Sequence, residues 1–169
     1  MSLITTPLHS ETDRYFIECC RTKLSKEYLP KIESCLSALS DDDIWWRAHE
    51  TNNSIGNLIL HLSGNIRQWI FHHLGGNEFV RNRDTEFSER DHIPAADLIQ
   101  HLREAVSDVD SVLKAFPTTH LLNIYTIQGY SVTGFEAILH ITEHFSYHTG
   151  QIIFITKLRT GKDLKFYNL

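Results

Sequence analysis

The chain has 169 residues, 41% of them hydrophobic and 22% charged, which suits one soluble globular domain over residues 1–169. Its formal net charge is -5 without a dense run of lysine and arginine, so we expect no nucleic-acid partner held through its phosphates. Because no apolar run reaches membrane-spanning length and the N-terminus lacks a signal pattern, we expect no membrane partner and a cytoplasmic location.

The first predicted helix covers about residues 10–39, where apolar residues recur at helical spacing. Pro30 lacks an amide donor and crowds the preceding turn, so we expect a kink near Leu29. This helix also carries the chain's three cysteines, whose spacing is not that of a metal site; we expect free, buried thiols in a reducing compartment. Asp41 is then a candidate cap for a short turn that leads into Trp45 and Trp46.

The second predicted helix runs from residue 53 or 54 to Leu74, and Gly75 and Gly76 end it. Beside its apolar arc lies a separate stripe of amide and imidazole side chains: Asn57, His61, Asn65, Gln68 and His72. A solvated face is one interpretation of this stripe. The absence of any charge within it favours the lining of a site instead.

A polar connection over residues 77–93 is longer than a usual link between helices, so it either covers a functional opening or spans the end of a bundle. Pro94 opens a third helix that reaches Phe116. Residues 121–130 are rich in β-branched and aromatic side chains, but the segment is short and isolated. We interpret it as an extended linker without a sheet.

The last predicted helix covers Ser131–Thr160, with Thr133 and Glu136 at capping-box spacing. Its histidines, His140, His144 and His148, recur every four residues and therefore stack along one face. Two imidazoles at this spacing can reach one divalent cation. The chain holds eleven histidines in all, so spacing has to select among them.

Four long helices without repeats predict an all-α fold, a four-helix bundle with a long connection between helices 2 and 3. The last helix carries apolar residues on several sides, including Ile141, Ile155 and Leu158. That pattern indicates either a homodimer interface or a central position in the bundle.

For a metal site we prefer His144 and His148 as the pair and His61, from the uncharged stripe, as the third ligand. Three histidines would leave one position open for water or substrate, as in catalytic sites. His140 stays open as a replacement for one of the pair, and Gln151 could face the same cavity.

Residues 53–65 and 139–151, together with the Trp-Trp pair and the order of the helices, resemble the DinB-like superfamily of damage-inducible bacterial proteins. The resemblance implies a four-helix bundle, often homodimeric, and a divalent metal, nickel or zinc, held by His61, His144 and His148. Thr149 departs from the family pattern, in which many relatives have arginine before the Gly-Gln pair.

The function remains open at this level. By resemblance, one hypothesis is a transferase that passes a small thiol to an electrophilic substrate; others are a hydrolase that uses metal-activated water and a stress-response protein that binds metal without turnover. Asn57, Asn65 and Gln151 could orient a ligand, and Glu86 could reach in from the connection as a partner of a ligand. A competing motif, His140-x-x-Glu143-His144, fits the inverted zinc-peptidase pattern but is short and arises easily in a histidine-rich helix.

Overall fold

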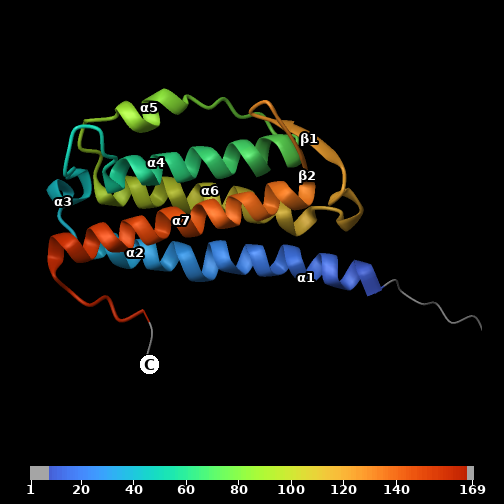
Figure 1. Ribbon diagram of the computed structural model, residues 1–169, viewed down its shortest axis with the longest axis horizontal. Coiled ribbons are helices and arrows are strands. Elements are labelled where there is room, and N and C mark those ends of the chain that lie inside the picture. The colour runs from blue at the N-terminus through green and yellow to red at the C-terminus, as the bar shows by residue number, and fades with distance from the viewer. Residues whose placement is uncertain (1–7, 167–169) are drawn as a thin grey trace, which may run out of the picture.

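A computed structural model describes residues 8–166, and four helical rods lie side by side in it (Figure 1). The first rod is α1 (Leu8–Thr22), the π-helical segment η1 (Lys23–Tyr28) and α2 (Leu29–Ser37). The second is α4 (Ile55–Ile66) continued by the π-helical segment η2 (Arg67–Leu74), and the other two are α6 (Ala95–Ala115) and α7 (Gly134–Thr160). The expected all-α four-helix bundle is confirmed.

The hydrophobic core lies between the four rods and draws fully buried residues from each of them, among them Ile17, Ile32, Ile59, Leu102 and Phe145. A short helix, α3 (Asp41–Trp45), adds Trp45 to this core. Trp45 packs directly on α4 because Gly56 has no side chain: a Cβ there would lie 2.7 Å from the Trp45 ring. Of the two adjacent tryptophans, Trp45 therefore has the core role.

Capping boxes start three of the helices. Ser54 and Asn57 cap α4, and Thr133 and Glu136 cap α7, as their spacing predicts. At α3 the cap is Ser40, whose hydroxyl accepts from the Asp43 amide, so the expectation of Asp41 as the cap is wrong. Asp41 instead accepts from the Ala95 amide (3.1 Å) at the start of α6.

Pro30 is the second residue of α2, directly after the π-helical segment η1. A proline ring in a regular α-helix clashes with the carbonyl four residues earlier, and a wider π-turn relieves such a clash. The interruption predicted near Leu29 therefore exists as a π-helical stretch within a continuous rod (Figure 1).

The segment between α6 and α7 forms a β-hairpin. After a short turn η3 (Thr118–His120), β1 (Ile124–Ile127) pairs antiparallel with β2 (Tyr130–Thr133), and Ile127 lies opposite Tyr130. Gln128 and Gly129 between them both have positive φ, 54° and 83°, as a two-residue type I′ turn requires. The prediction of a linker without a sheet is wrong, and the last helix begins at Gly134 because residues 131–133 belong to β2.

The long connection contains α5 (Arg83–Ser88), which lies along α4 (Figure 1). The Asn57 side chain donates to the carbonyls of Glu86 (2.9 Å) and Glu89 (3.2 Å). The connection therefore packs along α4 and does not merely span an end of the bundle.

Burial bears on two further expectations, the buried cysteines and the apolar residues on several sides of the last helix. Cys20 and Cys35 are buried free thiols, and burial raises the pKa of both, but Cys19 is exposed. Ile141 is fully buried in the bundle's own core, so it takes no part in an outward apolar face, whereas Leu158 is exposed. No helix within residues 8–166 is long and apolar enough to cross a membrane.

Candidate metal centre

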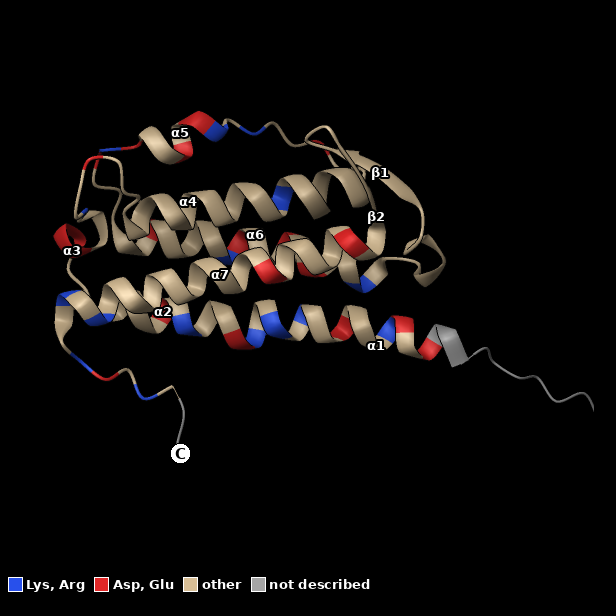
Figure 2. Cartoon of the chain, in the orientation of Figure 1, with Lys and Arg blue, Asp and Glu red and all other residues tan. Residues whose placement is uncertain are grey.

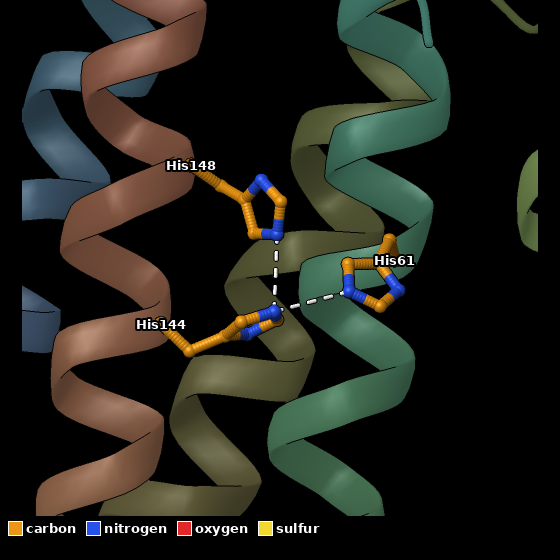
Figure 3. A group of neighbouring side chains, drawn as sticks. All are labelled: His61, His144 and His148. Atoms are coloured by element: carbon orange, nitrogen blue, oxygen red, sulfur yellow. Dashed lines mark hydrogen bonds between the residues drawn. The ribbon is translucent and has the colours of Figure 1, made fainter. Parts of the chain in front are cut away.

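Three histidines from two rods converge on one point (Figure 3). His61 projects from α4, and His144 and His148 project from successive turns of α7. The Nε2 atom of His144 lies 3.1 Å from Nε2 of His61 and 3.0 Å from Nε2 of His148. One nitrogen from each ring lies within 4.8 Å of the others, close enough for the three to hold a metal ion.

The other two residues of the His140-x-x-Glu143-His144 motif are not part of this triad. His140 stacks on Trp69 with 4.1 Å between ring centroids, and Glu143 is exposed to solvent. Among the described residues, neither joins the group that could hold an ion. The arrangement thus favours His148 over His140 as the partner of His144, and it offers no support for the inverted zinc-peptidase pattern.

The uncharged stripe of α4 faces the protein interior. Asn57, His61 and Asn65 are buried, which excludes the solvated-face interpretation for this part of the stripe. Figure 2 shows α4 in tan along most of its length, with the charged residues concentrated on other elements. A solvent-facing helix would carry such charges itself. The absence of charge from the stripe is therefore explained by its burial.

A buried carboxylate orients the His61 ring. Glu86 Oε2 lies 2.9 Å from Nδ1 of His61, and Arg81 donates to both Glu86 oxygens, with 2.6 Å to Oε2. Burial alone raises the pKa of Glu86, but the hydrogen bonds from Arg81 and His61 outweigh it and hold the pKa below its ordinary value. Because Glu86 is ionised and can only accept, Nδ1 of His61 carries the proton, and the Nε2 lone pair faces the other two histidines.

A second acceptor orients His148. Gln151, one turn later on α7, has its Oε1 atom 2.6 Å from Nδ1 of His148. Burial lowers the pKa of His148 despite this bond, and burial together with the neighbouring histidines lowers the pKa of His144 to about 3. Both rings are therefore neutral at pH 7, the state in which imidazole is a metal ligand.

The donor set fits a divalent transition metal. The lone pairs of His61 and His148 both face Nε2 of His144, which has at most one proton to offer them. Nδ1 of His144 is itself buried without a partner in the described part of the chain. A cation among the three nitrogens would engage all three lone pairs at once.

Gly64 makes room for this arrangement. A Cβ at Gly64 would overlap Glu86 Oε1 and lie 3.0 Å from Cδ of Glu86 and 3.1 Å from Nε of Arg81. Gly64 and Arg81 escaped the sequence-based prediction of the site. A glycine inside a helix costs about 1 kcal/mol relative to alanine. The presence of Gly64 within a helical pattern was therefore the available signal that another group packs closely against the helix.

A cavity of about 500 Å³ opens beside the triad and is lined by His61 and His144 themselves. Asn65, one of the residues that the sequence suggested for orienting a ligand, also lines this cavity. Asn57 has a structural role instead, because its side chain bonds Ser54, Arg47 and the connection above α4. Gln151 contacts His148 and lines a different cavity next to Trp46.

Comparisons with known proteins agree with this fold. The model of a family described as "Protein of unknown function (DUF1572)" matches residues 11–169. Among curated proteins, none matches the chain. The crystal structure of a DinB-like protein from Bacillus cereus ATCC 10987 superposes with a TM-score of 0.64 at 14% identity, covering 81% of this chain and 88% of that chain. At this identity, the likeness establishes the fold alone.

Proposed function

Because the chain belongs to the DUF1572 family, a DinB-like family, we propose that it binds one divalent transition metal, zinc or nickel, through His61, His144 and His148. The main support for this proposal is the convergence of the three Nε2 atoms. In two of the rings, Nδ1 also faces an acceptor, which is Glu86 for His61 and Gln151 for His148. Hydrogen-bonded acceptors of this kind accompany most metal-ligating histidines. Three protein ligands would leave one coordination position open toward the cavity.

For the reaction, we propose transfer of a small thiol to an electrophilic substrate. A bound divalent metal supplies a positive charge that lowers the pKa of a thiol. In the transfer, the thiol R–SH loses its proton to solvent, its sulfur forms a bond to an electrophilic carbon, and the leaving group departs from that carbon with the electron pair. The products are the thioether, the leaving-group anion and one proton, so the reaction needs no oxidant or reductant.

The protein's own residues would hold the site ready for this chemistry. Glu86 and Gln151 keep the protons of His61 and His148 on Nδ1, so that both Nε2 atoms stay available. Arg81, whose side chain is 4% exposed, fixes the Glu86 carboxylate. The cavity beside the triad offers the thiol and its partner a place partly shielded from water.

Within residues 8–166, the carboxylates around the triad are already hydrogen-bonded or face solvent, which favours thiol transfer over a hydrolysis that uses such a base. A hydrolase that activates water commonly employs a free carboxylate as a general base. Glu86 is engaged by Arg81 and His61, Glu143 is exposed, and the cavity-lining Glu136 caps α7. A thiol whose pKa is lowered needs no such base at pH 7.

Metal analysis of the purified protein tests the site. We expect about one equivalent of zinc or nickel in the wild type and strong depletion in His61→Ala and His148→Ala. His101→Ala, which removes an exposed histidine on α6, is the control and keeps the metal. Full occupancy in both triad variants would refute the ligand set.

A screen of thiols with a chromogenic electrophile tests the reaction. The metal-loaded protein is assayed with glutathione- and bacillithiol-type thiols, and in parallel after chelation. We expect turnover that disappears with the metal and returns on reloading. Activity that survives chelation would exclude the proposed chemistry, and binding of metal without any turnover would favour the stress-response alternative.

We further propose that the protein forms a homodimer through α7. Tyr147, Phe154 and Leu158 are 63%, 67% and 59% exposed, and their spacing places them along one side of the helix. An outward stripe of large apolar side chains supports an interface with a second copy.

A further inference from the structure

Two residues that line the cavity beside the triad each have a buried polar atom without a partner within the described residues. These atoms are Oδ1 of Asn65 and the indole Nε1 of Trp69. Both residues are only 5% exposed, so bulk water does not reach these atoms freely. An unsatisfied buried polar atom costs about 1–3 kcal/mol, and the fold does not explain why two residues spaced four apart each have one.

The two residues continue the line of the metal centre along one rod. His61, Asn65 and Trp69 follow each other at intervals of four residues on α4 and η2, so they lie on neighbouring turns, with about 5–6 Å between successive Cβ atoms. On the opposite rod, His144 faces His61, and His140 covers the Trp69 ring. The cavity therefore runs from the triad along both rods toward the β1–β2 hairpin, where Tyr130 lines its far side.

The chemistry of the two atoms defines which hydrogen-bond partner each of them lacks. The Trp69 Nε1–H group needs an acceptor, and the Asn65 carbonyl oxygen needs a donor. A hydroxyl does both with one oxygen: it accepts from the indole and donates to the amide. A purely apolar group would leave both atoms unsatisfied.

We propose that this cavity binds a small organic molecule with a hydroxyl that sits between Asn65 and Trp69, while its metal-binding head group lies at the triad. This substrate class rests on the proposed metal centre for the head group and on Asn65 and Trp69 alone for the hydroxyl. Asn65 and Trp69 are thereby specificity-determining residues, separate from the metal ligands.

A matched pair of probes tests the hydroxyl on the metal-loaded protein. 3-Mercapto-1-propanol and 1-butanethiol differ by a hydroxyl in place of a methyl group, and calorimetry gives the ratio of their dissociation constants. We expect Trp69→Phe and Asn65→Leu each to shift this ratio toward 1-butanethiol by about fivefold or more, the effect of one lost hydrogen bond. Trp46→Phe, in the other cavity, is the control and keeps the wild-type ratio. Equal ratios in all four proteins would overturn the proposal.

A second experiment needs no metal and separates the two proposals. In protein labelled with ¹⁵N-tryptophan, the Trp69 indole signal is assigned by its loss in Trp69→Phe, and 1,3-propanediol is titrated into the chelated sample. We expect a saturable shift of the Trp69 signal that Asn65→Leu abolishes. No shift would refute the hydroxyl site even if the metal binds, whereas a shift in a protein that takes up no metal would refute the metal centre and keep the hydroxyl site.

Discussion

At the residue scale, the metal centre depends on which ring nitrogen of each histidine carries the proton. Glu86 holds that proton on Nδ1 of His61, and Gln151 does the same for His148. Neither acceptor binds the cation in this arrangement, yet both determine whether the facing Nε2 atoms are available. Substitutions beside the ligands should therefore weaken metal binding without removing a ligand.

Glu86→Gln tests this role. The amide keeps an acceptor for His61 but loses the charge, and it leaves the buried Arg81 guanidinium without a counter-charge. We expect about a 10- to 100-fold loss of metal affinity, measured by competition with a chromophoric chelator. Glu89→Gln, in the same connection but away from the triad, is the control. Wild-type affinity in Glu86→Gln would show that the carboxylate has no part in the site.

Gly64→Ala is a second test of the same contact. The added Cβ would overlap the Glu86 carboxylate, so we expect weaker metal binding and a lower free energy of unfolding. Helix propensity alone predicts the opposite sign, a gain of about 1 kcal/mol. Gly150→Ala on α7, whose Cβ would meet nothing within 4 Å, should show that gain with unchanged metal affinity. Equal behaviour of the two variants in urea melts and metal titrations would contradict the close approach.

At the scale of elements, the β1–β2 hairpin and the long connection over residues 77–93 both contact the rod that carries His61. The amide of Gln128, at the hairpin turn, donates to Oε1 of Gln68 (2.6 Å), and Arg81 donates to the same oxygen (2.8 Å). Arg81 in turn fixes Glu86 against His61. Hydrogen bonds thus join the hairpin and the long connection to one metal-capable histidine, which makes these segments part of the site.

The sequence predicts the four helical rods much better than it predicts the hairpin and the long connection. Thr133 with Glu136 and Ser54 with Asn57 mark helix starts through local hydrogen bonds, and the four-residue spacing of His144 and His148 acts within one helix. The contact of Arg81 with Glu86 and His61 depends on how a loop folds over another element, and no periodicity encodes it. The hairpin escaped prediction because Gln128 occupies a turn position where asparagine or glycine is the usual signal.

The attachment of α3 to the end of α7 gives a pH-dependent prediction. Asp43 accepts hydrogen bonds from Arg159 and Ser40, which hold its pKa below the ordinary value. A lowered folded-state pKa stabilises the fold above the unfolded pKa of about 3.9, and this contribution is lost as the pH falls through the folded pKa.

We therefore expect Asp43→Asn to lower the free energy of unfolding at pH 7, by at most about 1 kcal/mol for a partly exposed pair. The difference from wild type should stay constant down to about pH 5 and shrink below about pH 4. Urea denaturation of the metal-free proteins across this range measures it, and Asp91→Asn, which changes an exposed aspartate in the long connection, is the control. A difference that persists unchanged at the lowest pH would rule out the ion pair as its source.

At the scale of the whole molecule, the surface divides by chemistry. Figure 2 shows charged residues along α1 and on α3 and α5, whereas much of α7 is drawn in the tan of uncharged or neutral residues. Tyr147, Phe154 and Leu158 are exposed apolar side chains along one side of α7. A second copy packed there would remove them from water.

Phe154→Asp should convert the proposed dimer into a monomer, because it would bury a charge in the interface. Sedimentation velocity or light scattering after gel filtration measures the mass of the particle. Tyr15→Ser removes an exposed aromatic side chain from α1 and should leave the dimer intact. A wild-type protein that is monomeric at all concentrations would contradict the proposed interface.

The most direct test of the central claim is an anomalous difference map from crystals of the metal-loaded protein, recorded on both sides of the metal's absorption edge. We predict one peak among the three rings, with Nε2 of His61, His144 and His148 each about 2.0–2.1 Å from it, and an open side toward the cavity. A peak that involves His140 or a surface site, or no peak between α4 and α7, would contradict the account.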